Sequence, residues 1–190
     1  DVHHHEPLVN FFNAWYNHIQ YTKNPLHHLG LFDMLDGDWK AFPPLDTFSE
    51  LRTVTVNHIS AFALGDFLEI LPRRLTHLYL KDHELPRYLT TPMGVDFCRV
   101  CNKLASLFQL QNLQVLSMEM HSYAIYYLCS FPGCFPQLRA LHLAKSTLDN
   151  HCRLYSSTKW NRDPLNCKWN CVFPQVSEMA LEGLEPVEVS

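Results

Sequence analysis

The sequence contains little glycine, no long run of basic residues and no long apolar run. Its six glycines are scattered singly, so no glycine-rich loop for binding phosphate can be assembled. No run of Lys and Arg exceeds two residues and the formal net charge is −4, so the clustered basic face that nucleic acid requires is missing. No apolar run approaches the roughly 20 residues of a membrane span. We therefore expect neither nucleic acid nor a membrane as a partner.

Catalytic and metal-binding motifs are missing as well. The twelve histidines fall in varied positions, and neither HExxH nor GxSxG is present. Cys98 and Cys101 have the spacing of a zinc or redox pair, but the same spacing places two small core residues on one helix face. His3, His4 and His5 are interpreted as a solvated leader rather than as a metal cluster or a tag remnant. We predict no enzyme, no metal and no cofactor.

Cysteine usage favours a reducing compartment. The chain has seven cysteines, an odd number at irregular spacing, and it has no Asn-x-Ser/Thr glycosylation site. We therefore expect an intracellular protein of the cytoplasm or nucleus.

A short apolar frame recurs along the chain. The segment LRALHL, which begins at Leu138, has leucine at its first, fourth and sixth places, and an extended strand turns places four and six to the same face. Frames with an aliphatic residue or Met at these places begin at Leu26, Leu51, Leu75, Leu113, Leu138 and Val176, with gaps of 25, 24, 38, 25 and 38 residues. We predict strands at 26–31, 51–56, 75–80, 113–118, 138–143 and 176–181, paired as one parallel sheet in sequence order.

The stretches between the frames have a helical rhythm. Apolar residues are spaced by three or four over 6–21 and again over 95–110. One strand and one helix cannot bury an apolar face alone, whereas stacked copies can. The sequence therefore predicts a single α/β domain over 1–190, with a leader and helix at 1–24 and about six repeats over 25–184. Because the chain begins without Met and ends shortly after its last frame, we expect a fragment of a longer protein.

These frames resemble the leucine-rich repeat family. Their irregular lengths of about 24–38 residues and the lead-ins FSEL, FPQL and FPQV resemble the repeats of fungal F-box and related leucine-rich proteins. The resemblance implies a solenoid with parallel strands on its concave face and helices on its convex face. The family usually has Asn or Cys three places after the sixth. Here those places hold Met34, Ile59, His83, His121, Ser146 and Leu184, which predicts a flatter stack.

The resemblance also implies a function. It is that of a non-catalytic module that binds a partner or substrate protein on its concave strands. One such module is the recognition arm of an F-box ubiquitin-ligase adaptor, with the ligase scaffold bound by a module outside this chain. The alternative is a structural stack within a larger protein or assembly.

The candidate partner site lies at places three and five of each frame and at the residue after place six, which point away from the core. We assign partner binding to His77, Tyr79, Lys81, Ser117, Glu119 and His142. Neighbouring strands lie about 4.8 Å apart, so Tyr79, Ser117 and His142 would line up across roughly 10 Å. The other outward residues are His28, Gly30, Phe32, Thr53, Thr55, Asn57, Val115, Ala140, Ala144, Glu178, Ala180 and Glu182.

The long insertion at 149–172 offers an alternative site. It contains Trp160 and Trp169, and long loops in compact domains are usually functional or disordered. These two residues either pack the loop onto the stack or present a hot spot to a partner.

Overall fold

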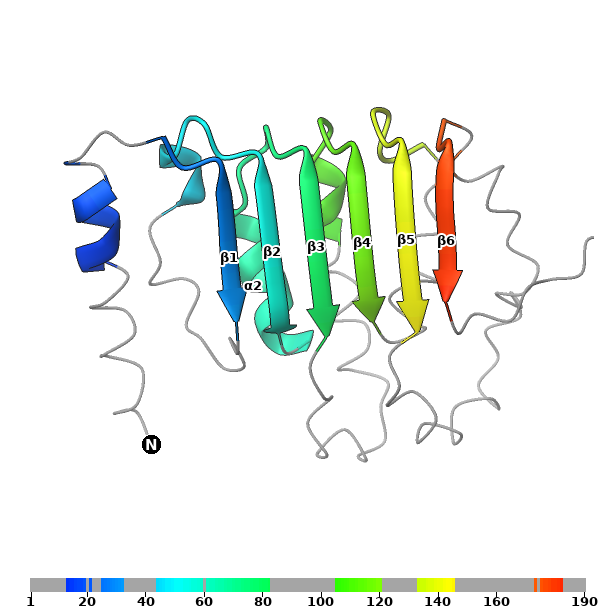
Figure 1. The fold of residues 1–190 in the computed structure, drawn as a ribbon, viewed down its shortest axis with the longest axis horizontal. Coiled ribbons are helices and arrows are strands. Elements are labelled where there is room, and N and C mark those ends of the chain that lie inside the picture. Colours follow the sequence, from blue (N-terminus) through cyan, green and yellow to red (C-terminus); the bar gives the residue numbers. More distant parts are fainter. Residues whose placement is uncertain are drawn as a thin grey trace, which may run out of the picture.

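The computed structural model describes residues 13–19, 21, 25–32, 44–59, 61–82, 105–120, 133–145, 173 and 175–182. Their main feature is one six-stranded sheet with the strand order β1 to β6 (Figure 1). The strands are His28–Phe32, Thr53–Ile59, His77–Asp82, Val115–Met120, Ala140–Lys145 and Glu178–Glu182. Every neighbouring pair is parallel, which confirms the predicted order and direction. Each strand begins two residues later than predicted, because places one and two of the frame belong to the preceding turn.

The strands pair so that equal places of the frame face each other. Thr55 is in register with Tyr79, Tyr79 with Ser117, and Ser117 with His142. Because parallel neighbours lie about 4.8 Å apart, each place forms a row of side chains across the sheet.

The apolar places of the frame form the core. Leu78, Leu80, Leu116, Leu141 and Leu143 are exposed by 0%, 2%, 0%, 1% and 0%, as predicted. A slip of one residue in register would have turned this whole set to solvent. The burial of places four and six therefore determines which face of each strand is the outer one.

The same tight turn precedes five of the strands. The backbone N–H of place one donates to the carbonyl three residues earlier in the pairs Leu51–Phe48, Leu75–Pro72, Leu113–Leu110, Leu138–Phe135 and Val176–Phe173, at 3.0–3.1 Å. The three Phe lead-ins are buried, and the rings of Phe135 and Phe173 stack with their centroids 6.4 Å apart. The lead-in Phe therefore anchors its turn in the core.

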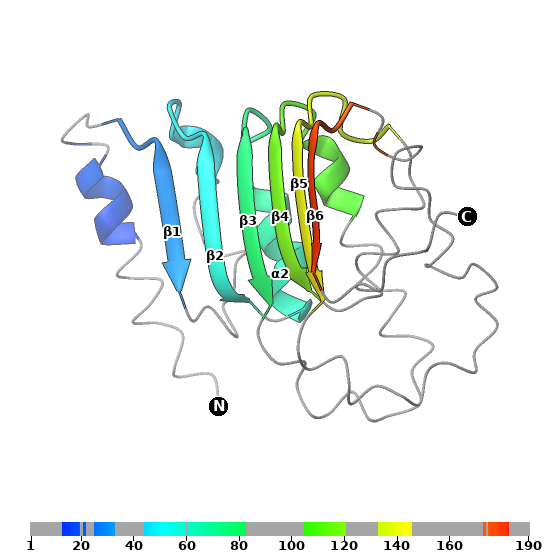
Figure 2. The same cartoon turned by 45° about the vertical axis from the view of Figure 1, so that its right-hand side comes forward.

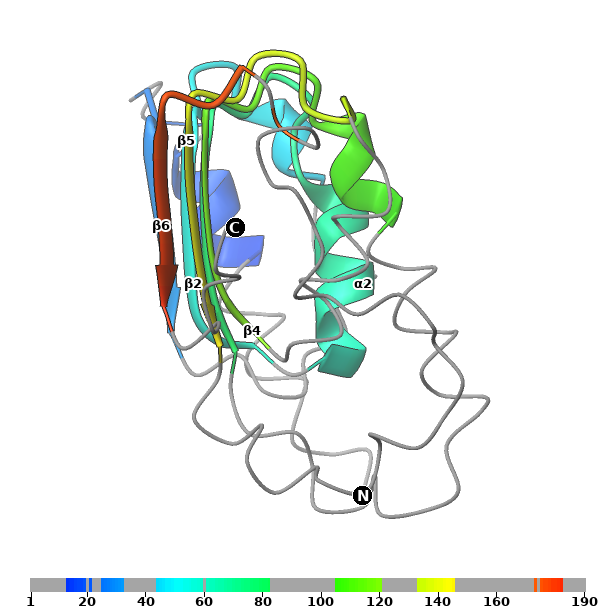
Figure 3. The same cartoon turned by 90° about the vertical axis from the view of Figure 1, so that its right-hand side faces the viewer.

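Helices cover one face of the sheet. The α-helix α2, Ala61–Ile70, and the 3₁₀-helix η4, Ala105–Gln109, lie on the same side in the edge-on view of Figure 3. A third helix at 13–19 lies beside β1 (Figures 1 and 2). Its Trp15 and Tyr16 rings lie 5.9 and 5.3 Å from that of Phe48, just past the short 3₁₀-helix η2, Leu45–Thr47.

Of the two stretches predicted to be helical, the first contains an α-helix and the second contains a 3₁₀-helix. Within 6–21, the described residues 13–19 are α-helical. Within 95–110, the described part is the 3₁₀-helix η4 rather than an α-helix, and the remainder lies outside the described residues. None of the helices described is both long and apolar enough to cross a membrane.

The end of β2 departs from simple alternation. The register with β3 shifts between Asn57 and Ile59, and the intervening His58 has a φ of 61°, in the left-handed region. The shift turns Ile59 into the core, where it is 1% exposed. Ile59, three places after the sixth place of its frame, is thus a core residue.

Several sequence predictions fall on residues that the structure leaves undescribed. They concern His3–His5, Cys98 and Cys101, and the insertion at 149–172 with Trp160 and Trp169.

Candidate functional site

The candidate site lies on the face of the sheet opposite α2 and η4, which we call the open face. It carries the side chains at places three and five and after place six, and no helix in the described part of the chain lies over it (Figure 3). One residue of the predicted outward set, Ala144, is buried, with 7% exposed. The reason is its size, because its methyl group lies in register between the longer Glu119 and Glu182.

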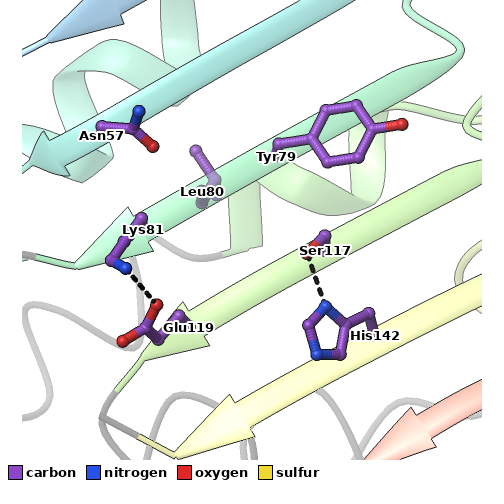
Figure 4. A pocket seen from close by; sticks show the side chains of 7 residues that line it. All are labelled: Asn57, Tyr79, Leu80, Lys81, Ser117, Glu119 and His142. Atoms are coloured by element: carbon purple, nitrogen blue, oxygen red, sulfur yellow. Dashed lines mark hydrogen bonds and ion pairs between the residues drawn. The ribbon is translucent and has the colours of Figure 1, made fainter. Parts of the chain in front are cut away.

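A hydrogen bond joins two residues of the predicted site across neighbouring strands. Ser117 Oγ lies 3.0 Å from Nδ1 of His142, and both side chains are partly exposed (Figure 4). Tyr79 is in register with Ser117 on the other side. The predicted line of Tyr79, Ser117 and His142 therefore exists, and its last two members hold each other in place.

An ion pair lies on the next row. Lys81 Nζ is 3.0 Å from Glu119 Oε2, and the two side chains are 49% and 34% exposed. Such partly exposed pairs contribute only about 0–1 kcal/mol, because water screens them and ordering two long side chains costs entropy. The pair fixes where charge lies on the open face more than it stabilises the fold.

Glu182 adds a second acidic group that the predicted site did not include. Its Oε1 lies 3.2 Å from Nε2 of His142. Nε2 is shielded from solvent and makes no hydrogen bond, so the two groups are close without being bonded. The signal for Glu182 was present in the sequence, since it follows place six of the last frame in register with Ala144.

These side chains border a shallow pocket of about 170 Å³ (Figure 4). It is lined by Asn57, Tyr79, Leu80, Lys81, Ser117, Glu119 and His142. Small-molecule sites usually measure about 300–1,000 Å³, so this pocket fits a side chain of a partner better than a cofactor.

The pocket brings together all of the predicted partner-binding residues except His77. His77 lies two residues before Tyr79 on β3, where its Nδ1 is 2.9 Å from Thr76 Oγ1. Asn57 and Leu80 line the pocket although they were not assigned to it. Asn57 reaches the pocket because it is in register with Lys81 on the neighbouring strand β3.

Away from the pocket, the described segments contain one free thiol and no metal-binding cluster. Within those segments, no group of three or more His, Cys, Asp or Glu residues is placed to hold a metal ion. Cys134 is a free thiol in the turn before β5, and burial raises its pKa to about 11. The alternative site at Trp160 and Trp169 lies outside the described residues.

Comparisons with protein-family models, with curated proteins and with solved structures found no match to this chain.

Proposed function

We propose that this chain is a leucine-rich-repeat solenoid that recognises a partner protein on its open face. Three observations support the proposal: the strands pair in sequence order, equal frame places are in register, and the same turn precedes five of them. In this proposal the open face is the concave one, and α2 and η4 lie on the convex side. The spacing of 24–38 residues then reflects connections of different length between similar strands.

The observation that carries the proposed function is the composition of the pocket. Tyr79, Ser117 and His142 stand in one row, with Lys81 and Glu119 beside them, on strands whose opposite side is buried core. Aromatic side chains with a polar tip suit interfaces, because they supply contact area and a hydrogen-bonding group together. A rigid sheet also keeps such groups in position before a partner arrives, which lowers the entropy cost of binding.

The geometry favours binding over catalysis. Ser117, His142 and Glu182 are arranged like the nucleophile, base and acid of a catalytic triad. Ser117 Oγ lies 3.0 Å from Nδ1 of His142, and Glu182 Oε1 lies 3.2 Å from its Nε2. However, Nε2 of His142 makes no hydrogen bond to the carboxylate. β4 and β5 are also paired on both sides, so the sheet already uses the backbone amides that could stabilise an oxyanion. These features support a non-catalytic role.

We further propose that the recognition is intracellular and of the F-box adaptor type. The chain would bind the substrate, and a module outside it would engage the ubiquitin-ligase scaffold. The support for this step is the likeness of the frames and their lead-ins to fungal F-box leucine-rich proteins. A structural stack is the second candidate. The two end strands favour it, because β1 and β6 each pair with one strand only in the described sheet. Each thus has an edge that a neighbouring chain in a larger assembly would cover.

Peptide selection tests the partner-binding proposal. A displayed random-peptide library would be selected on the immobilised chain, and the dissociation constants of enriched peptides would be measured against the Tyr79→Ala/His142→Ala double variant. We expect the double variant to lose most of the affinity. The matched control is Phe32→Ala, which removes an exposed aromatic ring from the same face at β1. Full affinity in the double variant would overturn the proposed site.

A further inference from the structure

The outer edge of β6 has unpaired backbone groups in the described sheet. β6 is an end strand, bonded to β5 through hydrogen bonds that include Glu178 N–H to the carbonyl of Arg139 at 3.1 Å. In a parallel ladder alternate residues bond to opposite sides. The N–H and C=O groups of Met179 and Leu181 therefore point away from β5, toward the position of a next strand.

The apolar row is also less covered at this edge than at the other end of the sheet. On β1 the core residues Leu29 and Leu31 are 5% and 6% exposed, whereas Met179 and Leu181 on β6 are only partly buried. The β1 end is flanked by the helix at 13–19, from which Trp15, Tyr16 and Ile19 pack against the core. Among the residues that the structure describes, β6 therefore offers both unpaired backbone and incompletely buried apolar side chains.

The outward residues of β6 give this edge a charge. Glu178 and Glu182 are both exposed, with the small Ala180 between them. Among the described residues, Glu178 has no ion-pair partner and Glu182 is close only to His142. Within the described part of the chain, no Lys or Arg pairs with either carboxylate, so the outer side of β6 is acidic.

We propose that the edge of β6 accepts an extended segment of a partner protein as a seventh, parallel strand. The register specifies the segment, because residues opposite Glu178 and Glu182 would be Lys or Arg and those opposite Met179 and Leu181 would be apolar. The residue opposite Ala180 would point outward and would have to keep its backbone N–H. The recognised pattern is thus basic, apolar, any, apolar, basic. Strand addition of this kind derives affinity from main-chain bonds and specificity from alternate side chains.

The inference does not rest on the function proposed for the pocket, since neither Glu178 nor Glu182 lines it, although Glu182 lies 3.2 Å from His142, which does. It competes with a simpler interpretation, in which the two acidic side chains protect an exposed edge from unwanted pairing. The two interpretations differ in one measurable respect: protection requires no affinity for a basic strand.

Three fluorescein-labelled peptides test the inference by fluorescence anisotropy. The first contains Lys-Val-Thr-Val-Lys between Gly-Ser flanks, the second replaces both Lys by Glu, and the third is N-methylated at the central Thr. We expect the first to bind and the second to bind at least about tenfold more weakly, because two cross-strand attractions become repulsions. The third should lose binding, because its central N–H would donate to the Met179 carbonyl.

Reversing the charges on the protein complements the reversal of the charges on the peptide. The Glu178→Lys/Glu182→Lys variant should prefer the Glu peptide, and Glu69→Lys on the exposed surface of α2 should leave the preference unchanged. Circular dichroism of each variant verifies that it is folded, and Glu178→Gln/Glu182→Gln gives a milder second test. The inference is overturned if the Lys peptide does not bind at millimolar concentration, if N-methylation has no effect, or if the preference survives charge reversal.

Discussion

Arg74 donates a hydrogen bond from its guanidinium to the backbone carbonyl of Phe48, at 2.9 Å. The same carbonyl closes its own turn by accepting the N–H of Leu51. The guanidinium also bonds to the carbonyl of Asp46. Arg74 therefore ties the turn before β3 to the turn before β2. Gln175 makes the equivalent link near the other end of the sheet, where its side-chain amide donates to the carbonyl of Phe135.

These links give the first prediction. Arg74→Met keeps the apolar stem but removes the donors, and we expect it to lower the free energy of unfolding by about 1–2 kcal/mol, since bonds to charged groups are worth roughly 1.5–3 kcal/mol. The loss should lie toward the low end because the buried Nε of Arg74 has no hydrogen-bond partner to lose. Urea unfolding measures the difference.

The neighbouring arginine provides the control. Arg73 is exposed in the same turn, and Arg73→Met should change the free energy of unfolding by no more than about 0.5 kcal/mol. Equal losses in the two variants would mean that the guanidinium link contributes nothing beyond general charge.

A second prediction tests the core assignment of the frame. Leu141 lies in the middle of β5 with 1% exposed, in register with the buried Leu116. Leu141→Ala should cost about 2–5 kcal/mol of unfolding free energy, because it removes packed methyl groups from a site that collapses only partly. Val115→Ala, on the outward side of β4, should cost much less. A loss below about 1 kcal/mol for Leu141→Ala would contradict the buried face.

Sequence reasoning predicted the sheet because strand burial has a period of two. An aliphatic residue or Met at places four and six of each frame is enough to set the buried face, and aligning these places between frames sets the register of neighbouring strands. Leu78 and Leu143 are buried for this reason. Tyr79, Ser117 and His142 meet in one row for the same reason, since fixing the buried face also fixes the outward one.

Features that depend on local backbone strain or on side-chain reach could not be predicted this way. The bulge at His58 turns Ile59 inward, and no periodicity in the sequence signals it. The burial of Ala144 depends on the lengths of its neighbours across the sheet. The bonds of Arg74 require two turns to be stacked before a donor on one can reach a carbonyl on the other.

A third prediction concerns Cys134. Burial raises the pKa of its thiol from an ordinary 9.0 to about 11, so at pH 7.5 the folded chain should hold roughly 100-fold less thiolate at this position than the unfolded chain. Alkylation by iodoacetamide, followed residue by residue with mass spectrometry, should be slowed accordingly in the folded protein. Equal rates in native buffer and in urea would contradict this.

The same shift makes stability depend on pH in the alkaline range. The folded state holds the Cys134 proton more tightly than the unfolded state, so this contribution is fully present below pH 9 and is lost as the pH rises toward 11. Cys134→Ala should flatten the decline of unfolding free energy between these pH values relative to the parent chain. An unchanged slope would show that the thiol does not titrate with folding.

The final prediction separates binding from folding at Tyr79. Its side chain stands on the open face while Leu78 and Leu80 on either side are buried, so Tyr79→Ala should change the unfolding free energy far less than Leu141→Ala does. Against a peptide selected on the parent chain, the same variant should lose about 1 kcal/mol or more, roughly a fivefold rise in Kd, as buried aromatic anchors commonly do. Tyr79→Phe keeps the ring and removes the hydroxyl, so it should retain more of the affinity if contact area dominates. Isothermal titration of the three proteins measures the affinities, and urea unfolding measures the stabilities. If Tyr79→Ala binds as tightly as the parent chain, the partner does not use this row of the sheet.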